Sequence, residues 1–200
     1  IIYSSWRRDT NGDGVIDVRD NSGIYTRNIM TGIETVIAGD DYNNMFPVFS
    51  PDGTSVAYLS VRRDTNRDGK IDSMDNPGLY LHDLVRRKEY LLVSDKSFNK
   101  FPVFTPDGKK IVFISSWRDG QDSGDFFENK GIYIVNIVSQ KINQIVSDKY
   151  YGSRSPVISP KGDCIAYLSW RRDTNRGLYL AYLDRQPDRE DLRQWIEANL

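Results

Sequence analysis

The 200-residue sequence predicts an all-β protein made of repeated units of four short antiparallel strands. A turn signature, Pro-Asp-Gly or Pro-Lys-Gly, follows each Phe-Pro-Val-Phe or Ser-Pro-Val-Ile segment in the sequence. The prolines of these segments, Pro47, Pro102 and Pro156, are separated by 55 and 54 residues. A second signature, Gly-Ile/Leu-Tyr, occurs at residues 23–25, 78–80, 131–133 and 177–179.

Each unit is expected to contain its four strands in a fixed order. The first strand is the Phe-Pro-Val-Phe segment or its equivalent, at 46–49, 101–104 and 155–158. The proline sets one turn dihedral and the glycine closes the hairpin, so the second strand follows at 56–61, 111–117 and 165–170. The third strand carries Gly-Ile/Leu-Tyr. The fourth is predicted at 34–38, 89–93 and 143–146.

Four-stranded units at a period near 50 residues are typical of a β-propeller, whose blades pack face to face and bury their inner strands on both sides. The almost continuously apolar second strands suit such double burial. A β-sandwich is the alternative, although it does not require a fixed period. The sequence therefore favours a β-propeller of four-stranded antiparallel blades.

These motifs resemble a known family. The Ser/Thr-Pro-Asp-Gly turn, the following Ser-Trp-Arg-Arg-Asp or Ser-Val-Arg-Arg-Asp segment and Gly-Ile/Leu-Tyr are similar to the TolB-type propeller repeat, over roughly residues 1–183. The same repeat occurs in the propellers of prolyl oligopeptidase-like peptidases. The resemblance implies the fold and leaves the function open.

The expected strands number three, four, four and three, which gives about four blades or part-blades within residues 1–184. We expect an open arc, completed by further sequence or by a second copy, with apolar end faces to which Tyr3, Ile24 and Ile165 contribute. Residues 185–200 are expected to form a short amphipathic helix, because Leu192, Trp195, Ile196 and Leu200 fall at helical spacing.

A twelve-residue loop rich in Asp and Asn separates the second and third strands of the first two units. Calcium prefers six to eight oxygen ligands, which such a loop supplies from positions one, three, five, seven, nine and twelve. In the first loop these are Asp9, Asn11, Asp13, the Val15 carbonyl, Asp17 and Asp20. In the second they are Asp64, Asn66, Asp68, the Lys70 carbonyl, Asp72 and Asp75. A solvated turn is the alternative for one such motif, but two complete copies favour calcium as cofactor.

The twelfth position is Asp rather than Glu, as in dockerin-type loops, which this pattern resembles. The flanks are β-rich, so each loop is expected to join two strands and calcium to act as a structural clamp. In the third unit a weaker candidate site comprises Asp119, Gln121, Ser123 and Asp125. The fourth unit retains no such set.

Arginines recur just before these loops. Arg8, Arg63, Arg118 and Arg172 are candidates for a ligand face at one mouth of the propeller, where they would grip carboxylate or phosphate groups. The alternative is that the arginines balance the acidic loops and stack on Trp6, Trp117 and Trp170.

Composition and motifs limit the function further. A formal net charge of -1 gives no field to recruit nucleic acid, and no apolar run is long enough to insert into a membrane. We expect no enzyme activity, because His82 is the only histidine, Cys164 is the only cysteine and Gly-x-Ser-x-Gly is absent.

The sequence therefore predicts a calcium-binding propeller that is a non-catalytic scaffold in the periplasm or outside the cell. Its partner would be a protein or an anionic ligand on the loop face, and self-association would complete an open arc. The alternative is a non-catalytic propeller domain of a larger serine peptidase or glycan-processing enzyme.

Overall fold

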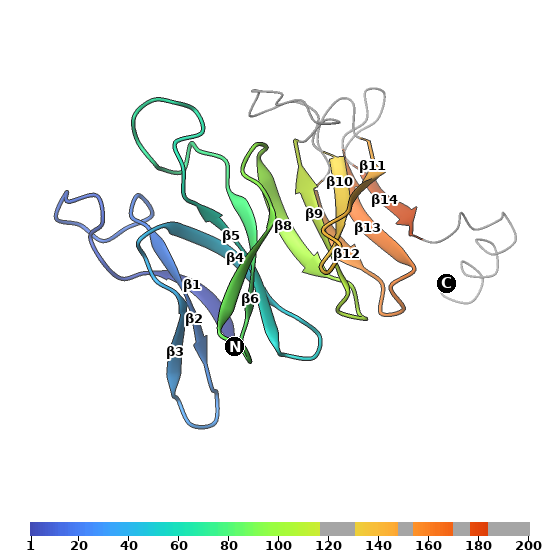
Figure 1. Ribbon diagram of the computed structural model, residues 1–200, viewed down its shortest axis with the longest axis horizontal. Coiled ribbons are helices and arrows are strands. Elements are labelled where there is room, and N and C mark those ends of the chain that lie inside the picture. The colour runs from blue at the N-terminus through green and yellow to red at the C-terminus, as the bar shows by residue number, and fades with distance from the viewer. Residues whose placement is uncertain (117–130, 148–153, 170–176, 184–200) are drawn as a thin grey trace, which may run out of the picture.

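The strands of the protein form four antiparallel sheets that stand side by side in an arc (Figure 1). The computed structural model describes residues 1–116, 131–147, 154–169 and 177–183. The sheets contain three, four, four and three strands, as the sequence predicts, and we number them as blades 1 to 4. Four separate sheets exclude the sandwich alternative and confirm the blades of a propeller.

The strands follow the chain in order within each blade. Blade 1 contains β1 (Ile2–Trp6), β2 (Ser22–Arg27) and β3 (Glu34–Ala38). Blade 2 contains β4 (Asn43–Phe49), β5 (Ser55–Val61), β6 (Gly78–Asp83) and β7 (Lys88–Val93). Blade 3 contains β8 (Asn99–Phe104), β9 (Lys110–Ser115), β10 (Gly131–Asn136) and β11 (Ile142–Val146). Blade 4 contains β12 (Arg154–Ile158), β13 (Cys164–Ser169) and β14 (Gly177–Tyr182).

The described residues form strands and connecting segments but no helix. Accordingly, no helix among them could cross a membrane. The helix expected at 185–200, and the boundary before it, lie outside the described residues.

The first strand of blades 2, 3 and 4 carries a bulge at its proline. The pairing of β4 with β5 shifts register between Met45 and Val48, and the equivalent shifts recur in the other two blades. The residue before each proline has a positive φ, 52° at Phe46, 51° at Phe101 and 50° at Ser155. Proline cannot donate to the strand ladder, so the bulge accommodates it within the sheet.

The Pro-Asp-Gly turn forms as the sequence predicts. Gly53 has a φ of 70° and its N–H donates to the Ser50 carbonyl at 2.9 Å. Asp52 accepts hydrogen bonds from the Ser50 hydroxyl at 2.6 Å and from the Thr54 N–H at 3.0 Å. These contacts hold β4 and β5 in a tight hairpin.

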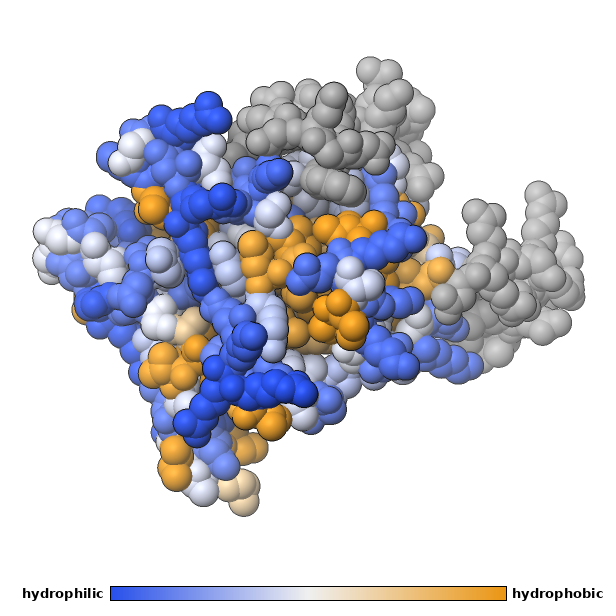
Figure 2. All heavy atoms as spheres, viewed as in Figure 1, coloured by the Kyte–Doolittle hydropathy of each residue, from blue (hydrophilic) through white to orange (hydrophobic). Residues whose placement is uncertain are grey.

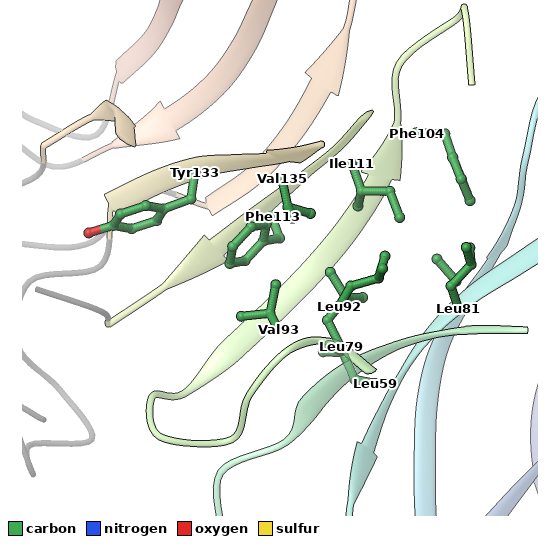
Figure 3. Packing of buried hydrophobic residues seen from close by; sticks show 11 residues of the cluster. Leu59, Leu79, Leu81, Leu92, Val93, Phe104, Ile111, Phe113, Tyr133 and Val135 are labelled. Atoms are coloured by element: carbon green, nitrogen blue, oxygen red, sulfur yellow. The ribbon is translucent and has the colours of Figure 1, made fainter. Parts of the chain in front are cut away.

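The hydrophobic core lies between the blades rather than at one centre. Blade 2 contributes Leu59 and Leu79, and blade 3 contributes Phe113 and Tyr133, to the cluster drawn in Figure 3. Similar clusters lie between blades 1 and 2 and between blades 3 and 4. Each fully buried side chain of this size contributes about 1.5–3 kcal/mol to folding, so packing between blades is the main stabilisation.

One expectation about the end blades is wrong. Ile24 and Ile165 were expected on exposed faces, but both are fully buried. Ile24 packs against blade 2 and Ile165 packs against blade 3, because each side chain points toward a neighbouring blade. Tyr3 is half-buried.

Candidate functional site

Each of the two acidic loops connects two strands of one blade, at equivalent positions in blades 1 and 2. Loop 9–20 lies between β1 and β2, and loop 64–75 lies between β5 and β6. Figure 2 shows that loop 64–75, at the upper left of this view, is largely hydrophilic. The loops therefore join two strands, as the sequence predicts.

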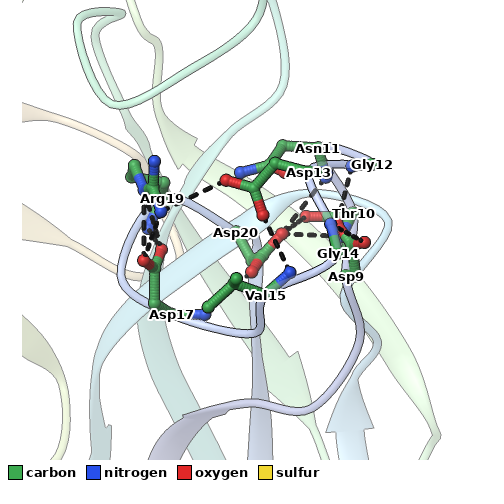
Figure 4. A network of polar contacts seen from close by, with 10 residues as sticks. All are labelled: Asp9, Thr10, Asn11, Gly12, Asp13, Gly14, Val15, Asp17, Arg19 and Asp20. Atoms are coloured by element: carbon green, nitrogen blue, oxygen red, sulfur yellow. Dashed lines mark hydrogen bonds and ion pairs between the residues drawn. The ribbon is translucent and has the colours of Figure 1, made fainter.

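Asp and Asn side chains organise loop 9–20 through its own backbone (Figure 4). The Asp9 carboxylate accepts hydrogen bonds from the N–H groups of Gly12 at 2.6 Å and Gly14 at 2.8 Å. Further along, side-chain oxygens accept the N–H two residues ahead, an arrangement typical of Asx turns. These contacts join Asn11 to Asp13 at 2.9 Å, Asp13 to Val15 at 2.9 Å and Asp17 to Arg19 at 2.8 Å.

Loop 64–75 repeats this arrangement. The Asp64 carboxylate accepts from Gly69 N–H at 2.9 Å, and Asn66 accepts from Asp68 N–H at 2.9 Å. The glycine at the sixth position has a positive φ in both loops, 85° at Gly14 and 88° at Gly69. A side chain is strained at this φ, so glycine permits the sharp turn at both sites.

The twelfth residue of each loop is buried and closes the loop. The Asp75 carboxylate accepts from the Thr65 N–H at 2.6 Å, the Asn66 N–H at 3.1 Å and the Asp72 N–H at 3.0 Å. Burial by itself raises the pKa of Asp75, but these hydrogen bonds outweigh it and lower the pKa below its ordinary value.

Asp20 has the same role in the first loop. Backbone hydrogen bonds lower the pKa of Asp20, and the bond from the Asp17 N–H, at 2.9 Å, has the largest effect. Asp20 and Asp75 were predicted only as ligands, a role that stays a prediction, and their contacts show that they close the loops.

A threonine that the sequence interpretation missed completes each loop. The Thr10 hydroxyl contacts Asp20 at 3.2 Å and accepts from the Asn21 N–H at 2.7 Å. Thr65 makes the equivalent contacts with Asp75 and Asn76. The second position of both loops is Thr, which is the only signal in the sequence for this role.

The loops differ in their basic residues, which are Arg19 in loop 9–20 and Arg67 and Lys70 in loop 64–75. The Arg19 guanidinium lies 3.2 Å from Asp13 and 2.7 Å from Asp17, so it bridges positions five and nine. The equivalent residue in the second loop is Met74, which carries no charge. Loop 9–20 therefore neutralises part of its own acidic charge.

The donor set of both loops fits a hard cation by its chemistry. Within the described ranges, no three Asp, Glu, His or Cys side chains converge as a metal cluster. All the candidate donors are oxygens, the type that calcium prefers. An ionised carboxylate has about four acceptor positions, so Asp9 with two hydrogen bonds keeps the capacity to bind an ion. Asp20 and Asp75 already accept four hydrogen bonds each and would have to release a donor to bind one.

Arg8 and Arg63, two candidates for binding an anionic ligand, form ion pairs with aspartates of the protein itself. Arg8 lies 2.9 Å from Asp40 and 3.0 Å from Asp41, in the connection between blades 1 and 2. Arg63 forms a two-point contact with Asp95, in the connection between blades 2 and 3. An anionic ligand would have to compete with these aspartates.

The neighbouring arginines Arg7 and Arg62 stack on tyrosines, while the predicted Trp117 and Trp170 lie outside the described residues. The Arg7 guanidinium lies 3.7 Å from the centre of the Tyr25 ring, and Arg62 lies 3.9 Å from that of Tyr80. The tyrosine of Gly-Ile/Leu-Tyr lies on the neighbouring strand, and its ring provides the cation–π contact. Trp6 remains partly exposed.

Several candidates lie outside the described residues. They are Arg118 and Arg172 and the third-loop set of Asp119, Gln121, Ser123 and Asp125.

Comparison with known proteins identifies relatives. A protein-family model described as the TolB beta propeller domain matches residues 16–190. A "Tol-Pal system protein TolB" of Francisella tularensis subsp. holarctica is 30% identical in an alignment of 200 residues. That alignment covers 81% of this chain and 43% of the relative, so the chain spans less than half the length of this curated relative.

Two solved structures show the same fold. TolB from Acinetobacter baumannii superposes with a TM-score of 0.60 and 23% identity, over 80% of this chain and 35% of that one. Pyrococcus horikoshii acylaminoacyl peptidase superposes with a TM-score of 0.60 and 15% identity, over 92% of this chain and 29% of that one. Identities this low support the fold alone.

Proposed function

The chain belongs to the TolB β-propeller family, and we propose that it is a non-catalytic propeller that binds a protein partner, with calcium ordering its acidic loops. The similarity to a Tol-Pal system protein supports a role in a protein assembly. The observation that carries the calcium proposal is the repeated architecture of loops 9–20 and 64–75. Both loops have the same types of oxygen donor, most of the same backbone hydrogen bonds and the same glycine turn.

Calcium would be held by the candidate ligands of each loop and would neutralise their charge. Asp9, Asn11, Asp13, the Val15 carbonyl, Asp17 and Asp20 would hold it in the first loop. Asp64, Asn66, Asp68, the Lys70 carbonyl, Asp72 and Asp75 would hold it in the second. Because each loop joins strands that are already paired, binding would stabilise the blade without moving it. Surface loops of this kind suit millimolar calcium, which supports a periplasmic or extracellular location.

The two loops should differ in affinity. An ion in loop 9–20 must displace Arg19 from Asp13 and Asp17, whereas loop 64–75 has Met74 at the same position. We therefore expect the second loop to bind calcium more tightly than the first. Arg19→Met should bring the first site closer to the second.

Calorimetric titration of metal-stripped protein with calcium tests the proposal. We expect two sites, of which Asp13→Ala removes the weaker and Asp68→Ala the tighter. Asp52→Ala is the matched control, because Asp52 belongs to the turn between β4 and β5 and should leave both sites unchanged. The absence of any calcium-dependent heat or gain in melting temperature would exclude the calcium part of the proposal.

A second candidate is the propeller of a larger peptidase. The likeness to acylaminoacyl peptidase supports this candidate at the level of the fold. The full open reading frame separates the two: a Gly-x-Ser-x-Gly motif beyond these residues, with later Asp and His, would favour the peptidase.

A further inference from the structure

The short hairpin turns of all the blades lie at one edge of the sheets. Because the strands follow one another in antiparallel order, the turn between the first two strands of a blade and the turn between its last two lie at the same edge. We call this the turn edge. Loop 9–20 and loop 64–75 lie at the opposite edge: Figure 1 shows the turn between β2 and β3 at the bottom and loop 64–75 at the upper left.

Three turns present an exposed apolar side chain at the same position. Met30 is 88% exposed, Val85 is 75% exposed and Val138 is 93% exposed. Each lies in the turn that follows the Gly-Ile/Leu-Tyr strand of its blade. Val85 and Val138 belong to blades 2 and 3, each of which packs between two other blades. Their exposure is therefore a property of the turns and does not come from the ends of the chain.

One kind of hydrogen bond holds all three turns. In turn 83–88 the Asp83 carboxylate accepts from the Val85 N–H at 3.0 Å and from the Arg86 N–H at 2.8 Å. An asparagine at the same position of turns 28–33 and 136–141 accepts two equivalent bonds, of 2.8–3.1 Å. These Asx turns fix the local backbone, so three blades present the apolar side chain in the same way.

The arrangement of the three side chains suits a flat partner. Equivalent positions of propeller blades are related by rotation about one axis, so these side chains lie at about the same height along that axis. They belong to different blades and are separate points rather than one continuous patch. A protein partner is usually bound by a continuous, well-packed patch, whereas a lipid bilayer can meet several separate points at once.

The charge of these turns indicates which lipids fit. Turn 83–88 carries Arg86, Arg87 and Lys88 against Asp83, and turn 136–141 carries Lys141 and no acidic residue. Basic residues beside exposed apolar side chains are typical of proteins that bind anionic lipid surfaces. The acidic loops lie at the opposite edge of the sheets, so they would face away from such a surface.

A cavity of about 140 Å³ lies at the same edge, between blades 3 and 4. Lys110 of blade 3 and Lys161 of blade 4 line it, together with Ile134 and Leu183. Among the ion pairs of the described residues, none involves either lysine. Asp107 also lines the cavity, but its carboxylate already accepts from a threonine hydroxyl at 2.6 Å and a backbone N–H at 3.0 Å. Two ammonium groups around one small cavity favour a phosphate group.

The pair of lysines is specific to this junction. Between blades 2 and 3 the position of Lys110 is occupied by Ser55 and that of Lys161 by Asp107. The turns of blades 3 and 4 also lie close together, since a Cβ added at Gly162 would be 3.2 Å from Pro106 Cδ. The repeat therefore places both basic side chains at the one junction where they line a cavity.

We propose that the turn edge binds the surface of a membrane that contains anionic phospholipids. Met30, Val85 and Val138 would enter the headgroup region, and a lipid phosphate would lie in the cavity between Lys110 and Lys161. The contact is made by side chains of turns and requires no membrane-spanning segment. The proposal goes beyond the proposed function and does not depend on calcium.

Co-sedimentation of the protein with vesicles, in the presence of a chelator, tests the proposal. Vesicles of phosphatidylcholine mixed with phosphatidylglycerol should bind the protein, and vesicles of phosphatidylcholine alone should bind it far more weakly. Added salt should weaken binding, because it screens the basic residues. Failure of the wild type to bind the anionic vesicles would overturn the proposal and leave the turn edge to an acidic protein partner. Equal binding to both kinds of vesicle would also overturn it.

Two double variants test the two parts of the surface. Val85→Ser with Val138→Ser should lower the affinity for anionic vesicles about tenfold, because less apolar surface is buried. Lys110→Gln with Lys161→Gln should lower it about tenfold or more. These side chains are exposed, so a wild-type Tm is expected and would show that the variants fold. Double variants that bind like the wild type would overturn the proposal.

Controls at the opposite edge and a soluble anion complete the test. Val18→Ser and Lys96→Gln remove an exposed apolar and an exposed basic side chain there, and both should leave vesicle binding unchanged. Calorimetric titration with inorganic phosphate separates a lipid phosphate from a free one. Tight binding of inorganic phosphate that requires Lys110 and Lys161, without any vesicle binding, would assign the cavity to the free anion and overturn the lipid proposal.

Discussion

Replacing Asp75 by asparagine separates its structural role from a role as calcium ligand. The carboxylate is only 1% exposed and accepts four hydrogen bonds: two from Thr65 and one each from Asn66 and Asp72. Asn keeps the shape but loses the charge, and its amide nitrogen must face one of the donors. If Asp75 acted only as a calcium ligand, the substitution would stabilise the calcium-free protein, because it would relieve repulsion between carboxylates.

The expected loss follows from the hydrogen bonds. Bonds to a charged acceptor contribute about 1.5–3 kcal/mol each, against about 0.5–1.5 kcal/mol for neutral ones, and an unpaired buried donor costs about 1–3 kcal/mol. Partial relaxation of a surface loop reduces the sum, so we expect about 2–4 kcal/mol of lost unfolding free energy. For a chain of this size, that corresponds to a fall in Tm of about 4–16 °C.

Thermal unfolding in the presence of a chelator is the assay. Asp72→Asn is the control, because the Asp72 carboxylate accepts a single backbone hydrogen bond, from Met74 at 2.8 Å, and should lower Tm by less. The pKa of Asp75 is lowered by folding, so its stabilising effect is present above the ordinary pKa near 4 and is lost at lower pH. An unchanged or higher Tm for Asp75→Asn in chelator would refute this reasoning.

Two further predictions concern the blades. Gly131→Ala should lower the unfolding free energy by about 1–3 kcal/mol, because its Cβ would lie 2.6 Å from the Val146 carbonyl oxygen. Gly39→Ala, whose Cβ meets nothing within 4 Å, should change stability far less in the same urea titration. Hydrogen bonds from Arg7 and, to a smaller extent, from Tyr3 lower the pKa of Glu34 to about 2. Ionised Glu34 therefore stabilises the fold above its ordinary pKa, and this stabilisation is lost as the pH falls toward 2. The Tm difference between wild type and Glu34→Gln should therefore shrink from pH 5 to pH 2, and a constant difference would argue against the ion pair.

The sequence by itself determined the strands, the turns and the blade repeat, because these depend on local chemistry. Proline fixes φ at Pro51 and glycine permits the positive φ at Gly53, whatever surrounds them. The last strand of blade 1, β3, forms at the predicted residues, Glu34–Ala38. The oxygen-rich loops could also be recognised from the sequence, since a ligand pattern depends on residue type and spacing. Calcium binding in these loops stays a prediction.

Only the tertiary structure decided which faces are covered and which charges are paired. Ile24 and Leu178 occupy the same position after a glycine, yet the first is buried and the second exposed, because blade 1 is followed by another described blade and blade 4 is not. Arg8 and Arg63 meet aspartates that lie more than 30 residues away in the chain. Burial and ion pairing depend on neighbours that the fold brings together, so a repeat in sequence determines equivalent positions but does not determine equivalent environments.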